Sequence, residues 1–73
     1  MQTWTIKTAA DFGAAVRAAR TQQRLTQRQL ALSVGAGERF IVDLESGKPT
    51  SRLGKALEVA AALGIKTSMI YEA

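Results

Sequence analysis

Apolar side chains recur at intervals of three and four residues along most of this chain, the spacing that gathers them on one face of a helix. Four stretches show it, at about residues 9–23, 26–34, 38–46 and 52–63. The predicted inward-facing side chains are Phe12, Ala15, Val16, Ala19, Leu30, Ala31, Val34, Ile41, Leu44, Leu53, Leu57, Ala60 and Leu63. We therefore predict an all-α fold with four helices around one hydrophobic core.

Residues typical of helix ends bracket these stretches. Thr26 and Gln29 have the spacing of a capping box, in which two side chains accept hydrogen bonds from the first turn of a helix. Thr8 ahead of Asp11 resembles another helix cap, with an acid in the first turn. The other predicted ends are the caps Gly37 and either Thr50 or Ser51, and the C-terminal glycines Gly35, Gly47 and Gly64. Each stretch can thus begin and end as a helix.

The period changes after the fourth stretch, where alternation of side chains predicts a β-strand over about residues 65–71. The side chains on one face of this strand are Ile65, Thr67, Met69 and Tyr71. A lone strand leaves its backbone unpaired, so we expect it to pair with the same strand of a second copy, with these four residues at the dimer interface. The alternatives are that they complete the core of one monomer, or that the strand pairs with Trp4–Ile6, a short strand or an ordered arm.

The composition excludes several classes of chemistry. The chain of 73 residues makes one small domain, spanning 1–73, and a core of that size is often stabilised by dimerisation. It contains no Cys and no His, so it lacks the usual metal ligands and the usual general base. Its acids form no recognisable catalytic pair. We therefore predict a protein that is not an enzyme and holds neither metal nor cofactor.

The net charge of +4 favours an anionic partner, although the same charge can serve solubility alone. Eight of the ten Lys and Arg residues lie at or before Arg52, which favours a partner that contacts this part of the chain. No apolar run reaches the ~18 residues of a membrane span. The N-terminus lacks the basic and apolar regions of a signal peptide. We expect a cytoplasmic protein without a membrane partner.

The second and third stretches are separated only by a short break, Gly35-Ala36-Gly37, so two helices there must cross steeply and one must project. This is the helix-turn-helix arrangement, here over about residues 26–47. Its recognition helix fits the major groove of B-DNA, which admits one helix. The break therefore predicts double-stranded DNA as the partner.

The same region resembles the lambda-repressor/Cro-like (XRE) helix-turn-helix family, and the resemblance extends over all four helices. The matching residues are Leu25-Thr26-Gln27, Leu30-Ala31, Gly35, Ile41, Leu44-Glu45 and Gly47-Lys48. The stretch RFIVDLESGKPTSRLGKALEVAAALGI and the ending TSMIYEA further resemble the HipB-type antitoxins. That resemblance implies a homodimer that represses its own operon and binds a HipA-like serine/threonine kinase toxin.

The start of the third helix carries the predicted base contacts. Arg39 can pair bidentately with a guanine edge, and Glu38 can accept a hydrogen bond from cytosine N4 or instead orient Arg39. One turn on, Val42 can touch a thymine methyl group or pack in the domain. Asp43 is better suited to screening, or to pairing with an Arg, than to reading a base. The predicted base-facing set is Glu38, Arg39, Val42 and Asp43.

Polar side chains on both flanks of the helix pair are predicted to contact phosphates. The family match supports this role for Gln27, at a helix start where backbone amides can also meet a phosphate. The full predicted set is Gln27, Arg28, Ser46, Lys48, Thr50, Ser51 and Arg52. Surface charge alone can account for Arg28, and helix capping for Thr50 and Ser51.

The resemblance also implies an ion pair between Arg20 and Glu45 that ties the first helix to the end of the third. We expect this pair to be structural and to take no part in reading DNA. Phe40 stands where XRE domains often have a small residue. It therefore either packs in the core or wedges against DNA or a neighbouring helix.

Three functions fit these observations. The preferred one is an antitoxin, a homodimeric repressor that places one recognition helix in each half-site of a palindromic operator. The runner-up is a phage-type or orphan XRE regulator without a toxin. The third is a helix-turn-helix module that binds only protein, and the presence of Gln27 and Lys48 argues against it.

Overall fold

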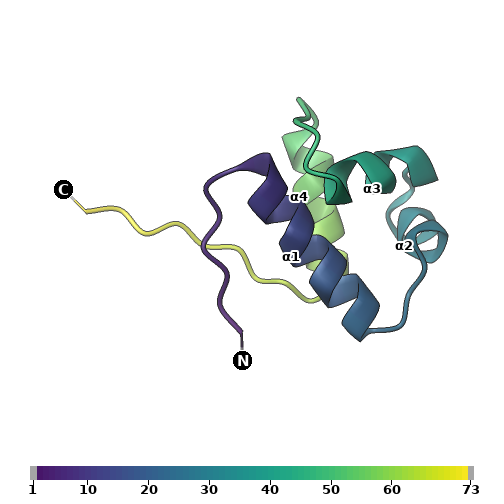
Figure 1. Cartoon of the computed structure of the whole chain (residues 1–73), viewed down its shortest axis with the longest axis horizontal. Helices are drawn as coiled ribbons and strands as arrows, with labels where there is room; N and C mark the ends of the chain where they lie inside the picture. The colour runs from purple at the N-terminus through teal and green to yellow at the C-terminus, as the bar shows by residue number, and fades with distance from the viewer. Residues whose placement is uncertain (1, 73) are drawn as a thin grey trace.

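The computed structural model describes residues 2–72, and residues 1 and 73 of the predicted domain lie outside the described residues. The described chain forms four helices, α1 (Ala9–Gln22), α2 (Gln27–Val34), α3 (Glu38–Glu45) and α4 (Leu53–Ala62). α3 packs against α1 and α2, and α4 packs against α2 (Figure 1). The predicted all-α fold is confirmed, and each helix end lies within one residue of its expected position.

Capping boxes begin α1 and α2. Thr8 Oγ1 accepts from the Asp11 N–H at 3.1 Å, and Asp11 Oδ2 accepts the N–H groups of Lys7 and Thr8 at 2.9 and 3.1 Å. These hydrogen bonds favour the ionised carboxylate, that from Lys7 most, and lower the pKa of Asp11 from its ordinary value of 3.8. Thr26 and Gln29 make the same exchange at 3.0 and 2.8 Å. Each box satisfies N–H groups that a helix start leaves without partners.

α1 and α3 approach each other so closely that two glycines are required where they meet. A Cβ atom on Gly13 would clash with the backbone oxygen of Leu44, which cannot move aside as a flexible side chain can. Gly47 has a φ of +88°, and a Cβ atom there would lie 2.9 Å from Ala10 Cα. The helical spacing predicts Gly47 only as a helix end and does not single out Gly13. Together the two glycines fix how α3 lies across α1.

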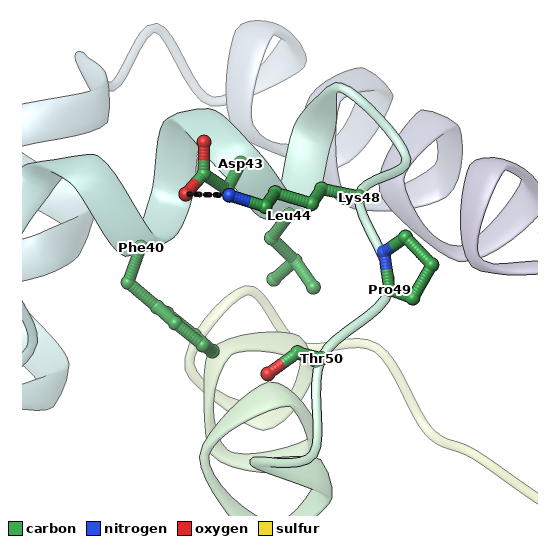
Figure 2. A pocket seen from close by; sticks show the side chains of 6 residues that line it. All are labelled: Phe40, Asp43, Leu44, Lys48, Pro49 and Thr50. Carbon is green, nitrogen blue, oxygen red and sulfur yellow. Dashed lines mark ion pairs between the residues drawn. The ribbon is translucent and has the colours of Figure 1, made fainter.

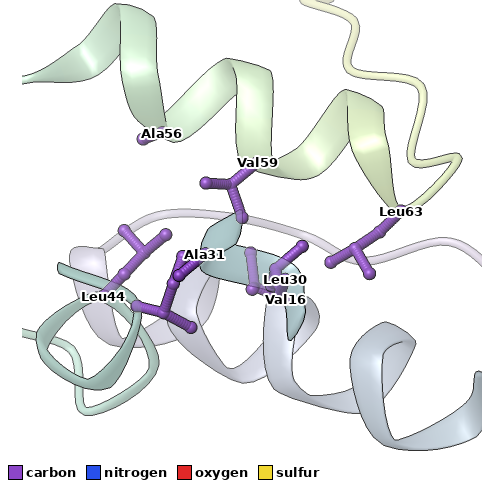
Figure 3. Packing of buried hydrophobic residues seen from close by; sticks show 8 residues of the cluster. Val16, Leu30, Ala31, Leu44, Ala56, Val59 and Leu63 are labelled. Carbon is purple, nitrogen blue, oxygen red and sulfur yellow. The ribbon is translucent and has the colours of Figure 1, made fainter. Parts of the chain in front are cut away.

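The hydrophobic core lies between the four helices (Figure 3). Its members are Val16, Leu30, Ala31, Ile41, Leu44, Ala56, Val59 and Leu63. The prediction for α4 is wrong in part, because Leu53 and Leu57 are 65% and 41% exposed. The buried face is rotated from the predicted one, so that Ala56 and Val59 face the core where two leucines were expected. Large apolar residues are thus a poor guide to which face of α4 is buried.

The N-terminal segment precedes α1. Residues 2–7 form neither helix nor strand, and Trp4 and Ile6 are 41% and 44% exposed. No strand is assigned anywhere in residues 2–72, so this segment does not pair with the C-terminal segment. Of the two predicted forms for Trp4–Ile6, the strand is not present in the described residues, and an arm that packs Trp4 on the domain stays a prediction.

The C-terminal segment, residues 65–72, is extended and leaves the helices (Figure 1). The predicted strand is not present within the described chain, because no other described segment forms backbone hydrogen bonds with residues 66–72. Ile65 packs against the core. Met69 and Tyr71, in contrast, are 99% and 88% exposed, so they do not complete the monomer core. The segment therefore presents apolar side chains that one copy does not cover.

Candidate nucleic-acid interface

α2 and α3 form the helix-turn-helix pair. Leu30 and Ala31 of α2 and Ile41 of α3 are each at most 2% exposed and hold the two helices together. α2 ends at Gly35, which has a φ of +65° and allows the sharp reversal that a side chain would disfavour. Gly37 is the N-cap of α3 and has no side chain to cap the helix. The N-terminal end of α3 therefore carries uncapped backbone N–H groups at the surface.

A largely buried ion pair lies behind this surface. Arg20 Nε and Nη2 donate to the two carboxylate oxygens of Glu45 at 2.6 and 3.0 Å, and Nη1 donates to the Leu25 carbonyl at 2.7 Å. The Arg20 and Glu45 side chains are 12% and 4% exposed. Hydrogen bonding to Glu45 raises the pKa of Arg20. The pair joins α1 to the end of α3 and to the segment that leads into α2.

Gln27, the first residue of α2, is part of the same network. Its Nε2 donates to Glu45 Oε1 at 3.2 Å, so the amide that was predicted to meet a phosphate is held against the buried pair. Because Thr26 and Gln29 exchange their bonds at this helix start, the capping box does not use the backbone N–H groups of Gln27 and Arg28. The Arg28 side chain is exposed beside them. Donors for an anion are thus present at the start of α2.

The exposed face of α3 carries a second, different cluster of charges. Asp43 Oδ1 lies 3.2 Å from Arg39 Nε, and Asp43 Oδ2 lies 3.7 Å from Lys48 Nζ. Figure 2 shows the contact with Lys48, which reaches back from the loop after α3. Glu38 is exposed ahead of this cluster and Val42 is half-buried. Arg39 and Asp43 are therefore brought together, and the Asp43 carboxylate is held by two cations.

The loop after α3 holds most of the predicted phosphate contacts. The Ser46 hydroxyl donates to the Asp43 carbonyl at 2.7 Å, and the Lys48 N–H donates to the same carbonyl at 3.0 Å. Lys48, Pro49 and Thr50 line a hollow of about 160 Å³ between this loop and α3 (Figure 2). Exposed polar groups thus follow the end of α3 closely.

Arg52 is placed by an aromatic ring. Its Cζ lies 4.8 Å from the centroid of the Phe40 ring, a cation–π distance. Arg52 is the N-cap of α4, and its N–H donates to Thr50 Oγ1 at 3.0 Å. The prediction that Thr50 or Ser51 is the N-cap is therefore wrong. Thr50 instead closes a short turn over residues 50–52, which ends at the N-cap of α4.

Two of these contacts have no signal in the sequence. Phe40 and Arg52 are twelve positions apart in different elements, and no local pattern links them. The Gln27 amide is bound to Glu45, which is far from it in the chain. Long-range pairing of this kind depends on how the helices cross. It becomes visible only once the fold is known.

The described residues carry no other obvious chemistry. Within residues 2–72, no group of three or more His, Cys, Asp or Glu side chains is placed to hold a metal ion. Among the helices of the described chain, none has the length and apolar character needed to cross a bilayer.

Comparison with known proteins identifies the family. Residues 16–70 match the family described as Helix-turn-helix (HTH_3). The chain belongs to this XRE-type helix-turn-helix family. It is 52% identical over 65 residues to an uncharacterised HTH-type transcriptional regulator, y4mF, of Sinorhizobium fredii, a match that covers 89% of this chain and 86% of the relative. The chain is thus an XRE-type DNA-binding transcriptional regulator.

Two solved structures share the fold. The restriction-modification controller protein C.AhdI from Aeromonas hydrophila is 31% identical, with a TM-score of 0.70 over 80% of this chain and 84% of that chain. A chain of the HipA–HipB–O2–O3 complex has a TM-score of 0.83 over 94% of this chain and 97% of its own, at 19% identity. At that identity the second similarity concerns the fold alone.

Proposed function

We propose that this XRE protein is a sequence-specific transcriptional repressor that binds a palindromic operator as a homodimer. The observation that carries the proposal is the exposed start of α3. There Arg39 is 81% exposed on a helix whose N-terminus no side chain caps. α3 is the second helix of the helix-turn-helix pair, the one that enters the major groove in proteins of this architecture.

The base contacts would come from one face of α3. Arg39 is long enough and free enough to pair with a guanine edge, and exposed Glu38 can accept from cytosine N4 or orient Arg39. Val42 is half-buried, which leaves part of its side chain for a thymine methyl group. Asp43 faces the same side but is engaged by two cations. We therefore assign direct reading to Arg39 first.

Phosphate contacts would flank α3 on both sides. On one side are Gln27, Arg28 and the N–H groups that begin α2. On the other is the loop after α3, with Ser46, Lys48, Thr50, Ser51 and Arg52. Each cation that replaces a counterion on B-DNA contributes about 0.9 to the slope of log affinity against log salt. Binding would accordingly weaken steeply as salt rises.

The second copy would pair through the C-terminal segment. Met69, Ile70 and Tyr71 are between 88% and 99% exposed, an apolar surface that soluble monomers seldom leave uncovered. Pairing residues 65–71 about a two-fold axis would satisfy the backbone and bring Ile65, Thr67, Met69 and Tyr71 together. It would also set two copies of α3 about one helical turn of DNA apart, or a multiple of it.

The finer proposal is that the protein is the antitoxin of a HipBA-like type II toxin–antitoxin system, which represses its own operon and neutralises a HipA-like kinase. The similarity of fold to a chain of the HipA–HipB–O2–O3 complex supports it. The alternative, a regulator without a toxin, is supported by the higher identity to the controller protein C.AhdI. Copurification with a kinase encoded beside the gene would favour the antitoxin. An operon without such a kinase would favour the alternative.

The DNA-binding proposal is tested by fluorescence anisotropy on the DNA upstream of its own gene and on a scrambled duplex of equal length. We expect tight binding of two protomers to the upstream DNA and a steep loss with salt. Equal affinity for both duplexes would contradict sequence-specific repression.

The dimer is tested separately by sedimentation equilibrium. We expect Met69→Asp with Tyr71→Asp to give a monomer, whereas Leu53→Asp, which also charges an exposed apolar position, leaves the dimer intact. A wild-type monomer at the concentration that saturates DNA would contradict pairing through the C-terminal segment.

A further inference from the structure

The cluster of Arg39, Asp43 and Lys48 is unusual for a surface that meets DNA. A carboxylate repels phosphates, yet Asp43 lies on the same face of α3 as the residue proposed to read bases. Its side chain is only 26% exposed, whereas Arg39 and Lys48 are 81% and 66% exposed. The less exposed acid therefore lies between two more exposed cations and pairs with both.

Helix stability does not explain this acid. Asp43 lies in the last turn of α3, where a negative charge opposes the helix macrodipole. Arg39 precedes Asp43 by four residues, and helices favour the reverse order, with the acid nearer the N-terminus. Exposed ion pairs of this kind also contribute little to folding. The placement of Asp43 is thus neutral or unfavourable for the isolated fold, and another role must account for it.

The geometry gives such a role. Asp43 makes its closest contact with Arg39 through the Nε atom of the guanidinium. The two Nη groups are therefore the donors with which Arg39 would pair bidentately with guanine. The Arg39 guanidinium can thus remain paired with the Asp43 carboxylate while it contacts a base edge. To reach a phosphate elsewhere, Arg39 or Lys48 would first have to leave Asp43.

We infer that Asp43 is a specificity-determining positioning residue, which presents Arg39 to a guanine edge and withholds Arg39 and Lys48 from phosphates on unrelated DNA. The inference rests on the proposed sequence-specific repressor. It predicts that Asp43 weakens sequence-independent binding more than it weakens operator binding. Discrimination then depends on an acid that makes no base contact itself.

The test is the affinity of Asp43→Asn for the upstream DNA and for a scrambled duplex, from about 50 to 200 mM salt. Freeing two cations should steepen the salt slope on scrambled DNA by about 1 to 2. Scrambled DNA should bind about tenfold tighter and the operator should change less, so the ratio of the two affinities falls. In an Arg39→Ala background the same substitution should lower the ratio much less, because Lys48 is then the one cation of the cluster that Asp43 still withholds.

Glu58→Gln is the matched control. It removes the same charge from an exposed acid that pairs with Lys55 at 2.7 Å on α4, outside the helix-turn-helix pair. We expect it to change neither the ratio nor the slope. An equal effect of both variants would mean that net charge alone acts, and would overturn the inference.

Two further outcomes separate the inference from the proposal beneath it. Wild-type preference for the operator that survives Asp43→Asn would overturn the inference alone, as would a clear fall in the melting temperature of Asp43→Asn. Absence of any preference in the wild-type protein would overturn the proposed function, and the inference with it.

Discussion

Two acids of α3, only two residues apart, have opposite surroundings. Glu45 points into the domain, where its side chain is 4% exposed and bound by Arg20 at 2.6 Å. Asp43 faces outward, 26% exposed, between Arg39 and Lys48 at 3.2 and 3.7 Å. One helix thus carries a structural ion pair on one side and a loose cluster of charges on the other. The difference shows how α3 is anchored while its outer face stays exposed, as the proposed contact with DNA requires.

Breaking the Arg20–Glu45 pair should cost more folding stability than breaking the pairs of Asp43. Removing one partner of a buried pair leaves an uncompensated charge in a medium of low dielectric constant. Breaking an exposed pair costs little, because water and salt replace the lost partner. Substitutions at the first site should therefore change stability, and substitutions at the second should change DNA binding.

The largest expected effect is that of Arg20→Ala. It leaves the buried Glu45 carboxylate without its bidentate partner and should lower the free energy of unfolding by about 3–5 kcal/mol. Urea denaturation measures this directly. Arg17→Ala removes the same charge from an exposed position on α1 and should change stability by no more than about 0.5 kcal/mol. Equal unfolding midpoints for the two variants would contradict the structural role of the pair.

A smaller effect is expected where α1 crosses α3. Gly13→Ala would drive a methyl group into the Leu44 carbonyl and should cost about 1–3 kcal/mol in stability. Gly54→Ala, on α4 with open space around it, should instead stabilise the protein by about 0.5–1 kcal/mol. Thermal unfolding of both variants provides the comparison. Similar shifts in the same direction would show that helix propensity, and not the close crossing, decides the result.

The smallest effect concerns Asp11, a partly exposed acid that accepts hydrogen bonds from backbone N–H groups. The pKa of Asp11 is lower in the folded protein than its ordinary value of 3.8. The ionised carboxylate therefore contributes fully to stability at a pH above 3.8, and this contribution is lost as the pH falls through the folded pKa. Melting temperatures between neutral pH and about pH 3 should fall less steeply for Asp11→Asn than for the wild type. Glu72→Gln, in the exposed C-terminal segment, serves as the control. Identical profiles for Asp11→Asn and wild type would contradict a role for the cap.

Local patterns predicted the helices well. The apolar period and the capping residues Thr8 and Thr26 lie within a few positions of the helices they define, so no knowledge of the fold is needed. Leu53 and Leu57 were assigned to the wrong face, because two adjacent stripes of α4 are both apolar and only packing selects one. No local sequence pattern predicts the role of Gly13, because that role depends on where α3 crosses α1.

The candidate interface was predictable only in part. The helix-turn-helix pattern predicts a contact for Arg39, and the family resemblance predicts one for Lys48; both contacts stay predictions. The stacking of Arg52 on Phe40 and the binding of the Gln27 amide to Glu45 join residues distant in the chain. The pairing of the C-terminal segment stays a prediction, because its partner would be a second copy.

The most direct test of base reading by α3 is the ratio of operator affinity to scrambled-duplex affinity for Arg39→Ala, measured beside the wild type by fluorescence anisotropy. We predict that the ratio falls by the equivalent of about 1–3 kcal/mol while the melting temperature is unchanged. Arg17→Ala should preserve the ratio. An Arg39→Ala protein that weakens equally on both duplexes would contradict base reading, since Arg39 would then contact only phosphates.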